Sequence, residues 1–223
     1  MKLYSGPLSL FSRKVEIALQ EKRLAFERVM VPFSQAEGYS PKHPAVLAAN
    51  PKSQVPVLID GDLTLFDSTL ILEYLEDAYP RPALWPSDPK ARARGRLIEL
   101  TADEILLPLV ARLMYRSEPP DGDPERRLSR EAEGRRAEAA LLVHYEKLGA
   151  QLATGEYFCG AFSIADIAMF MTILFSLRLK GPGLGEVPAL GAWYARVGQR
   201  PAVAKIAQEI AAADRELSPS LNA

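Results

Sequence analysis

Two serines near the start of the chain lie at a spacing that is typical of redox-active cysteines. Ser9 and Ser12 frame the segment Ser-Leu-Phe-Ser, just before an apolar periodic stretch, where a thiol-redox fold carries Cys-x-x-Cys. Because both positions carry hydroxyls, a thiol must arrive with a ligand, and a serine can donate a hydrogen bond to its thiolate. Such a bond contributes about 1.5–3 kcal/mol, which lowers a thiol pKa by about one to two units. The alternative is that either serine caps the following helix, and for Ser12 we favour this alternative.

A second candidate feature is the dipeptide Val55-Pro56, which opens a predicted strand after Asn50-Pro-Lys-Ser-Gln54. Proline at this point cannot donate a ladder hydrogen bond. A cis bond would turn the chain sharply and leave the Val55 backbone unpaired, so that an extended peptide could add there like another strand. A trans proline at an ordinary strand start is the alternative, since only a small minority of X-Pro bonds are cis.

A third candidate feature, Asp67-Ser68, precedes a helical stripe. Both residue types are common helix caps, which is one interpretation. In the other interpretation, free backbone N–H groups and the Ser68 hydroxyl hold a ligand carboxylate, while Asp67 pairs with its ammonium. Together these groups would recognise an amino-acid head group.

The hydrophobic pattern predicts the elements that must position these residues. Lys2 to Tyr4 and Phe26 to Val31 are expected to form parallel strands around a helix from Arg13 to Lys22. Asp60-Gly61 then joins two apolar runs, Val55 to Ile59 and Asp62 to Phe66, which predicts an antiparallel hairpin. The helix after Asp67 is expected to stop near Tyr79-Pro80. These features predict a small α/β unit with a mixed four-stranded sheet.

The remainder of the chain is predicted to be helical. The proline-rich stretch 81–89 is the best candidate boundary, so we expect a first domain over 1–80 and an all-helical domain over 90–223. Pro108 is expected to bend the first long helix, and Ser163 with Asp166 resembles a capping box that opens a buried central helix. The predicted helices run from Lys90 to Arg116, Glu125 to Thr154, Ser163 to about Phe175, Val187 to Arg200, and Pro201 to Ala213.

Composition narrows the function classes. The chain has 223 residues and a formal net charge of -1, so it lacks the long-range field that attracts nucleic acid or an anionic membrane. No apolar stretch has the length of a membrane span, and no secretory leader is expected. Cys159 is the only cysteine, which excludes an internal disulfide and suits a reducing compartment. We therefore expect a cytoplasmic protein. His43 and His144 give no metal-site spacing, so no metal is expected.

The combined motifs resemble the cytosolic glutathione transferases, a resemblance that covers the whole chain. They are most similar to the serine-type classes, particularly tau, with zeta-like features in the middle segment. The motifs that carry the resemblance are Leu3-Tyr-Ser, Ser9 to Leu19, Asn50-Pro with Gln54-Val-Pro56, Asp67-Ser68 with Glu73-Tyr-Leu75, and Phe162 to Asp166. The resemblance implies a thioredoxin-like α/β N-terminal domain, an all-α C-terminal domain, a homodimer and a role in detoxification, with glutathione as co-substrate.

The resemblance also implies roles for single residues. Ser9 falls on the catalytic serine that stabilises the glutathione thiolate, and the Val55 backbone on the partner of the cysteinyl moiety. Asp67 and Ser68 fall on the pair that binds the γ-glutamyl end. Lys42 matches a lysine near the glycine carboxylate, with a solvated loop lysine as the alternative. Gln54 is assigned to glutathione binding as well.

The sequence departs from the family pattern in several places. Asp67 replaces the more usual Glu or Gln, so affinity for glutathione is expected to be modest, and Phe11 stands where zeta enzymes carry a cysteine. Phe11, Arg112 and Tyr115 are candidates to line a pocket for a hydrophobic electrophile, with ordinary helix surface and core as the alternative. Other chemistry on the same thiolate remains open, namely peroxidase, isomerase or thioether and ether cleavage. A non-catalytic module for binding a protein partner is the alternative of another class.

Overall fold

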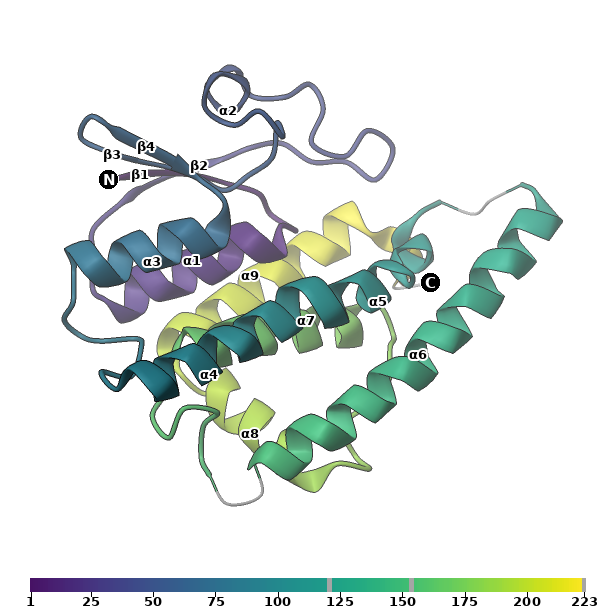
Figure 1. The fold of residues 1–223 in the computed structure, drawn as a ribbon. Coiled ribbons are helices and arrows are strands. Elements are labelled where there is room, and N and C mark those ends of the chain that lie inside the picture. The colour runs from purple at the N-terminus through teal and green to yellow at the C-terminus, as the bar shows by residue number, and fades with distance from the viewer. Residues whose placement is uncertain (120–121, 153–154, 222–223) are drawn as a thin grey trace. The chain divides into compact units, whose positions relative to one another are not determined.

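Four short strands pair in the order β2-β1-β3-β4 in the computed structural model, which describes residues 1–119, 122–152 and 155–221 (Figure 1). β1 (Lys2–Ser5) runs parallel to β2 (Glu27–Met30) and antiparallel to β3 (Val57–Asp60). β3 in turn pairs antiparallel with β4 (Leu63–Phe66). The mixed sheet predicted from the hydrophobic pattern is confirmed.

By their contacts, the residues form two units. One comprises Met1–Leu84 together with Ala202–Leu217, and the other comprises the residues from Trp85 to Pro201 and those from Ser218 onward. The last long helix, α9 (Pro201–Leu217), therefore belongs by contact to the unit that holds the sheet. The domain bounds 1–80 and 90–223 stay predictions.

Within the sheet-containing unit, helices cover both faces of the sheet. α1 (Leu10–Glu21) and α3 (Ser68–Ala78) pack side by side on one face, and α2 (Pro44–Ala49) lies on the other side (Figure 1). The end of α3 matches the prediction. The expected start of the first helix at Arg13 is wrong, because the helix already begins at Leu10. The short helix α2 was not predicted.

The hairpin between β3 and β4 turns one residue later than expected. Asp60 pairs with Leu63, so the turn is formed by the two residues between them, and Gly61 supplies the positive φ of +60°. The Asp60 carboxylate, just before the turn, accepts hydrogen bonds from the phenols of Tyr79 at 2.6 Å and Tyr74 at 2.8 Å. These two bonds lower the pKa of Asp60, and the same carboxylate raises the pKa of Tyr74 to about 12. The sheet is thereby tied to α3 and its C-cap.

The proline-rich linker is anchored by a buried lysine. The Lys22 ammonium lies 2.6 Å from the Glu76 carboxylate and donates to the carbonyls of Tyr79 and Pro82, at 2.8 and 3.0 Å. A buried ion pair of this kind needs such extra hydrogen bonds to offset its desolvation. The chain that leaves α3 is therefore held against α1.

The second unit contains the helices that follow the linker. Its helix α7 (Ile164–Arg178) is buried over most of its length, which confirms the predicted central helix. The Asp166 carboxylate accepts from the backbone N–H of Ser163 at 2.9 Å, as a capping box requires. The other α-helices of this unit are α4 (Pro89–Leu100), α5 (Leu107–Ala111), α6 (Pro124–Leu152) and α8 (Pro188–Gly198).

The single bent helix predicted from Lys90 to Arg116 is wrong. A π-helical stretch, η1 (Thr101–Leu106), separates α4 from α5, and a 3-10 turn, η2 (Met114–Ser117), follows. Pro108 has no N–H to donate into the helix, and the N–H of Leu107 donates to the carbonyl of Ala102, five residues back. The chain therefore widens just before the proline instead of only bending at it.

Two further predicted helix ends can be compared with the structure. The predicted end of the second long helix, Thr154, lies outside the described residues, while α9 extends four residues past the expected Ala213. A final 3-10 turn, η3, covers Pro219–Leu221. Within the part of the chain that the structure describes, no helix is both long and apolar enough to cross a membrane.

Candidate functional site

The strand register brings three chain segments to one edge of the sheet. Tyr4 near the end of β1 pairs with Val57 at the start of β3, and Val57 pairs with Phe66 at the end of β4. The loop that leads to Ser9, the Val55-Pro56 dipeptide and Asp67 all adjoin these strand ends. Ser9, Val55 and Asp67 therefore lie next to one edge of the sheet, although they span almost 60 positions of sequence.

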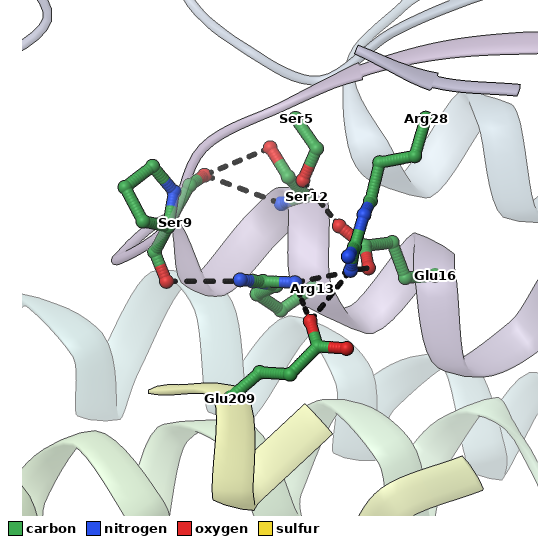
Figure 2. Close-up of polar contacts among 8 residues, drawn as sticks. Ser5, Ser9, Ser12, Arg13, Glu16, Arg28 and Glu209 are labelled. Carbon is green, nitrogen blue, oxygen red and sulfur yellow. Dashed lines mark hydrogen bonds and ion pairs between the residues drawn. The ribbon is translucent and has the colours of Figure 1, made fainter. Parts of the chain in front are cut away.

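Ser9 is the N-cap of α1 (Figure 2). Its Oγ accepts two hydrogen bonds from Ser12, one from the backbone N–H at 3.3 Å and one from the hydroxyl at 3.0 Å. Because a hydroxyl has one proton and two lone pairs, the Ser9 proton is left to donate to a third group. The capping role that we favoured for Ser12 is wrong, since Ser12 lies inside the helix and is fully buried. Ser9 both caps the helix and keeps a donor.

The Val55-Pro56 bond is cis, which decides between the two interpretations left open by the sequence. The ladder that joins β3 to its neighbours begins only at Val57. Val55 therefore lies before the ladder, half-buried against the cluster formed by Tyr4, Val31 and Val57.

Asp67 is the N-cap of α3, and Ser68 is the first residue of that helix. Asp67 Oδ1 accepts from the backbone N–H groups of Thr69 at 3.0 Å and Leu70 at 3.3 Å. The Asp67 backbone has φ +74° and ψ 125°. A positive φ favours glycine, and for any other residue such a backbone conformation costs about 1–3 kcal/mol. The Asp67 carboxylate therefore already accepts from two of the N–H groups that were predicted to bind a ligand carboxylate. At the start of α3, the candidates that remain for this role are the N–H and the hydroxyl of Ser68.

Lys42 and Gln54 lie in the exposed segments on either side of α2. Asn50, which the site prediction did not include, shapes the second segment. Its buried amide donates to the Gln54 carbonyl at 2.7 Å and accepts from the Lys52 N–H at 2.9 Å. The Asn-Pro dipeptide was the available signal. Asn50 thereby holds the loop that delivers Val55.

The residues proposed for the second substrate are distributed over both units. Phe11 is half-buried on α1, where the Lys14 ammonium lies 5.6 Å from its ring centroid. In the second unit, Arg112 pairs with Glu133 at 3.2 Å beside a hollow of about 330 Å³. Tyr115 lines a different hollow of about 540 Å³. The shared pocket for these residues stays a prediction.

A cluster of four charged residues adjoins the loop that carries Ser9, and no sequence pattern indicated it (Figure 2). Arg13 on α1 and Arg28 on β2 each contact the carboxylates of Glu16 and of Glu209 from α9. Burial alone would raise the pKa of Glu209, but the hydrogen bond and charge of Arg28, with those of Arg13, hold that pKa below its ordinary value. The cluster thus consists of two positively and two negatively charged side chains. Over residues 1–119, 122–152 and 155–221, no group of three or more His, Cys, Asp or Glu side chains is placed to hold a metal.

Comparison with protein families assigns both parts of the chain. The profile described as "Glutathione S-transferase, N-terminal domain" matches residues 3–83. The profile described as "Glutathione S-transferase, C-terminal domain" matches residues 105–201.

Three curated relatives carry three different names. The stringent starvation protein A homolog of Coxiella burnetii is 39% identical over 100 residues, 44% of each chain. The maleylacetoacetate isomerase of Pseudomonas aeruginosa is 44% identical over 97 residues, 43% of this chain and 45% of the relative. Glutathione S-transferase 4 of Zea mays is 31% identical over 219 residues, 93% of this chain and 92% of the relative. The first two matches span less than half of those relatives, whereas the third spans nearly the whole of both chains.

Solved structures share the fold. A glutathione S-transferase from Rhodospirillum rubrum superposes with a TM-score of 0.76 at 28% identity, covering 92% of this chain and 90% of that one. A glutathione S-transferase from Methylobacillus flagellatus with glutathione bound gives 0.74 at 26% identity, covering 92% and 98%.

Proposed function

Since the chain belongs to the glutathione S-transferase family, we propose that it binds glutathione and activates its thiol through Ser9 for attack on a small hydrophobic electrophile. The observation that carries this proposal is the Ser9 hydroxyl, which accepts two hydrogen bonds from Ser12 and therefore has its own proton to donate. At the N-terminus of α1, an anion is stabilised both by the hydrogen bond from this hydroxyl and by the positive end of the helix dipole. The thiolate sulfur then forms a bond to the electrophilic atom, while the bond from that atom to the leaving group breaks and the leaving group departs with the electron pair.

The same edge of the sheet supplies the proposed grip on the tripeptide. The Val55 backbone, outside the strand ladder, pairs with the cysteinyl moiety. Ser68 donates to the γ-glutamyl carboxylate, and Asp67 faces the amino group. Lys42 and Gln54 lie on the exposed side where the glycine end would be held. The glutathione-bound relative with the same fold supports glutathione as the ligand.

We predict that Ser68→Ala weakens glutathione binding about tenfold or more, because a hydrogen bond to a charged group contributes about 1.5–3 kcal/mol. Isothermal titration calorimetry with glutathione measures the effect. Thr64→Ala, an exposed hydroxyl on β4, is the matched control and should leave the affinity unchanged. Equal affinity in the Ser68 variant and in the unaltered protein would contradict the assigned role of Ser68.

An isomerase that uses the same thiolate is a second candidate, favoured by the identity to maleylacetoacetate isomerase over 97 residues. The two reactions differ in their consumption of glutathione. Conjugation removes the free thiol mole for mole with the electrophile, whereas isomerisation of a cis double bond returns it. A thiol count during turnover on an activated cis-enone therefore separates the two functions. Peroxidase and ether-cleaving activities need the same thiolate and can be screened with the same protein.

A non-catalytic partner-binding module is the remaining alternative, because not every relative that matches about half of the chain is named for an enzymatic activity. Failure of the unaltered protein to bind glutathione in the calorimeter would favour it. A cytoplasmic location and a role in detoxification belong to our enzymatic proposal, and the single cysteine supports the former.

We further propose a homodimer, supported by large apolar side chains that each unit leaves exposed. Leu97, Leu100 and Ile105 lie exposed along α4 and η1, and Leu70 on α3 is exposed in the other unit. Exposed apolar groups at successive helical turns are typical of an interface. The dimer would have twice the 24.5 kDa mass of the chain.

We expect Leu97→Glu to shift the protein from dimer to monomer, because an unpaired charge in a buried apolar contact costs several kcal/mol. Light scattering coupled to size-exclusion chromatography measures the mass. Leu128→Glu on α6 is a closely matched control, since Leu97 is 61% and Leu128 63% exposed. A monomeric mass for the unaltered protein would overturn the proposed dimer.

A further inference from the structure

The loop that carries Ser9 is fixed by a side chain from the helix that follows it. The Ser9 N–H donates to the Gly6 carbonyl at 3.2 Å, which closes the loop on itself. The Arg13 Nε then reaches back and donates to the Pro7 carbonyl at 3.4 Å. Since Ser9 follows Pro7 by two residues, this guanidinium contacts the backbone of the loop that carries Ser9.

The Arg13 guanidinium is in turn held by two carboxylates. Its Nη1 lies 3.0 Å from Glu16 Oε2 and 2.8 Å from Glu209 Oε2, and its side chain is only 2% exposed. Glu16 is fully buried and also accepts from the Ser5 hydroxyl at the end of β1. A buried guanidinium needs such partners, because an unpaired buried charge is strongly unfavourable.

Arg28 closes the cluster from the second strand. Its Nη1 lies 2.9 Å from Glu16 Oε2 and 2.5 Å from Glu209 Oε2, so each carboxylate contacts both arginines (Figure 2). Two positive and two negative charges therefore balance. Glu209 comes from α9, 196 positions after Arg13, and is the member of the cluster contributed from the far end of the sequence.

We propose that Glu209 is a positioning residue for thiol activation: it holds Arg13 against the Pro7 carbonyl and thereby sets the direction of the Ser9 hydroxyl. This inference rests on the proposed activation of glutathione by Ser9. Charge and geometry predict opposite results when Glu209 is removed. Loss of a negative charge would by itself leave an excess of positive charge and lower the pKa of a nearby thiol. Loss of the Ser9 alignment raises that pKa, because the hydrogen bond to the thiolate is weakened.

The test is the pKa of the glutathione thiol in the complex, read from the ultraviolet absorbance of the thiolate as a function of pH. We expect Glu209→Ala to raise this pKa by about one unit, which is about tenfold less thiolate at a pH below both values. kcat should fall in the same proportion, with the affinity for glutathione unchanged. Glu216→Ala, an exposed glutamate on the same helix, is the control and should alter neither quantity.

Two further variants keep the inference testable if Glu209→Ala folds poorly. Arg13→Lys preserves the charge but loses the planar fork that serves both carboxylates and the Pro7 carbonyl, so it should raise the thiol pKa as well. Glu209→Gln keeps an acceptor oxygen, and we expect a smaller rise than with alanine. An unchanged or lowered thiol pKa in the Glu209 variants, even with a reduced melting temperature, overturns the positioning role.

Failure of the underlying proposal gives a different pattern. If the unaltered protein and Glu216→Ala leave the thiol pKa of glutathione at its free value, activation by Ser9 is itself wrong, and the role of Glu209 falls with it. If they lower the thiol pKa and the Glu209 variants lower it equally, only the inference about Glu209 is wrong.

Discussion

Ser9→Ala should reduce conjugation of glutathione about 10- to 30-fold at neutral pH while leaving glutathione affinity nearly unchanged, because a thiol with a pKa of about 8.5 is still about 3% ionised at pH 7. The lost hydrogen bond to the thiolate corresponds to about 1.5–3 kcal/mol, or about one to two units of thiol pKa. The defect should shrink as the pH rises past the ordinary thiol pKa of about 8.5, because glutathione then ionises without help. The measurement is kcat/KM for conjugation across this pH range, with calorimetry for binding.

Ser12→Ala is the matched control for this prediction. Ser12 donates from its hydroxyl to Ser9 Oγ but keeps its backbone N–H bond when the side chain is removed. A neutral hydrogen bond contributes about 0.5–1.5 kcal/mol, so the loss of activity should stay below about tenfold. Full activity of Ser9→Ala would contradict the assigned donor, and a larger loss in Ser12→Ala would transfer that role to Ser12.

Asp166→Ala should lower the free energy of unfolding by about 3–5 kcal/mol, the range of the most damaging single substitutions. The Asp166 carboxylate is fully buried and accepts four hydrogen bonds. Their donors are the Ser163 N–H and hydroxyl, each at 2.9 Å, the Phe158 N–H at 3.2 Å and the Trp193 Nε1 at 2.8 Å. Alanine leaves these donors unsatisfied, at about 1–3 kcal/mol for each that water cannot reach.

Chemical denaturation measures this loss, and Asp88→Ala provides its control. Asp88 caps α4 in the same unit, but it is exposed and accepts from one backbone N–H, that of Ala91 at 2.7 Å. Loss of such a cap costs about 1 kcal/mol. Equal destabilisation by the two substitutions would show that the three contacts beyond the cap contribute nothing to Asp166.

The sequence pattern predicted the sheet well because each strand and each turn is specified by only a few neighbouring residues. Two apolar runs joined by Asp-Gly predicted β3 and β4, and the cis bond at Pro56 was one of the two interpretations that the sequence left open. The helix that begins at Leu10 shows the limit of such patterns. Two serines three residues apart are equally good caps in isolation, and only the structure shows that Ser9 is the cap and that Ser12 lies inside the helix.

The remaining misses also have physical causes. Pro108 signals a break in a helix, but the width of the turn before it depends on how neighbouring helices pack, which one residue type cannot report. α2 has six residues, too few for a hydrophobic period to emerge. Glu209 resembles any surface glutamate on an amphipathic helix. Only the fold reveals that two arginines near the other end of the chain face it.

The membership of α9 in the first unit has a consequence for how the protein is made. A ribosome synthesises the sheet, Ser9 and both arginines of the cluster long before it reaches Glu209. Until α9 emerges, Glu16 alone faces two guanidinium groups, and the nascent unit carries an unbalanced positive charge where the finished protein is neutral. The first unit to be translated is therefore among the last to be completed. A chain that stops before residue 202 would lack the contact from Glu209 that we propose positions Ser9, even though Ser9 itself is present.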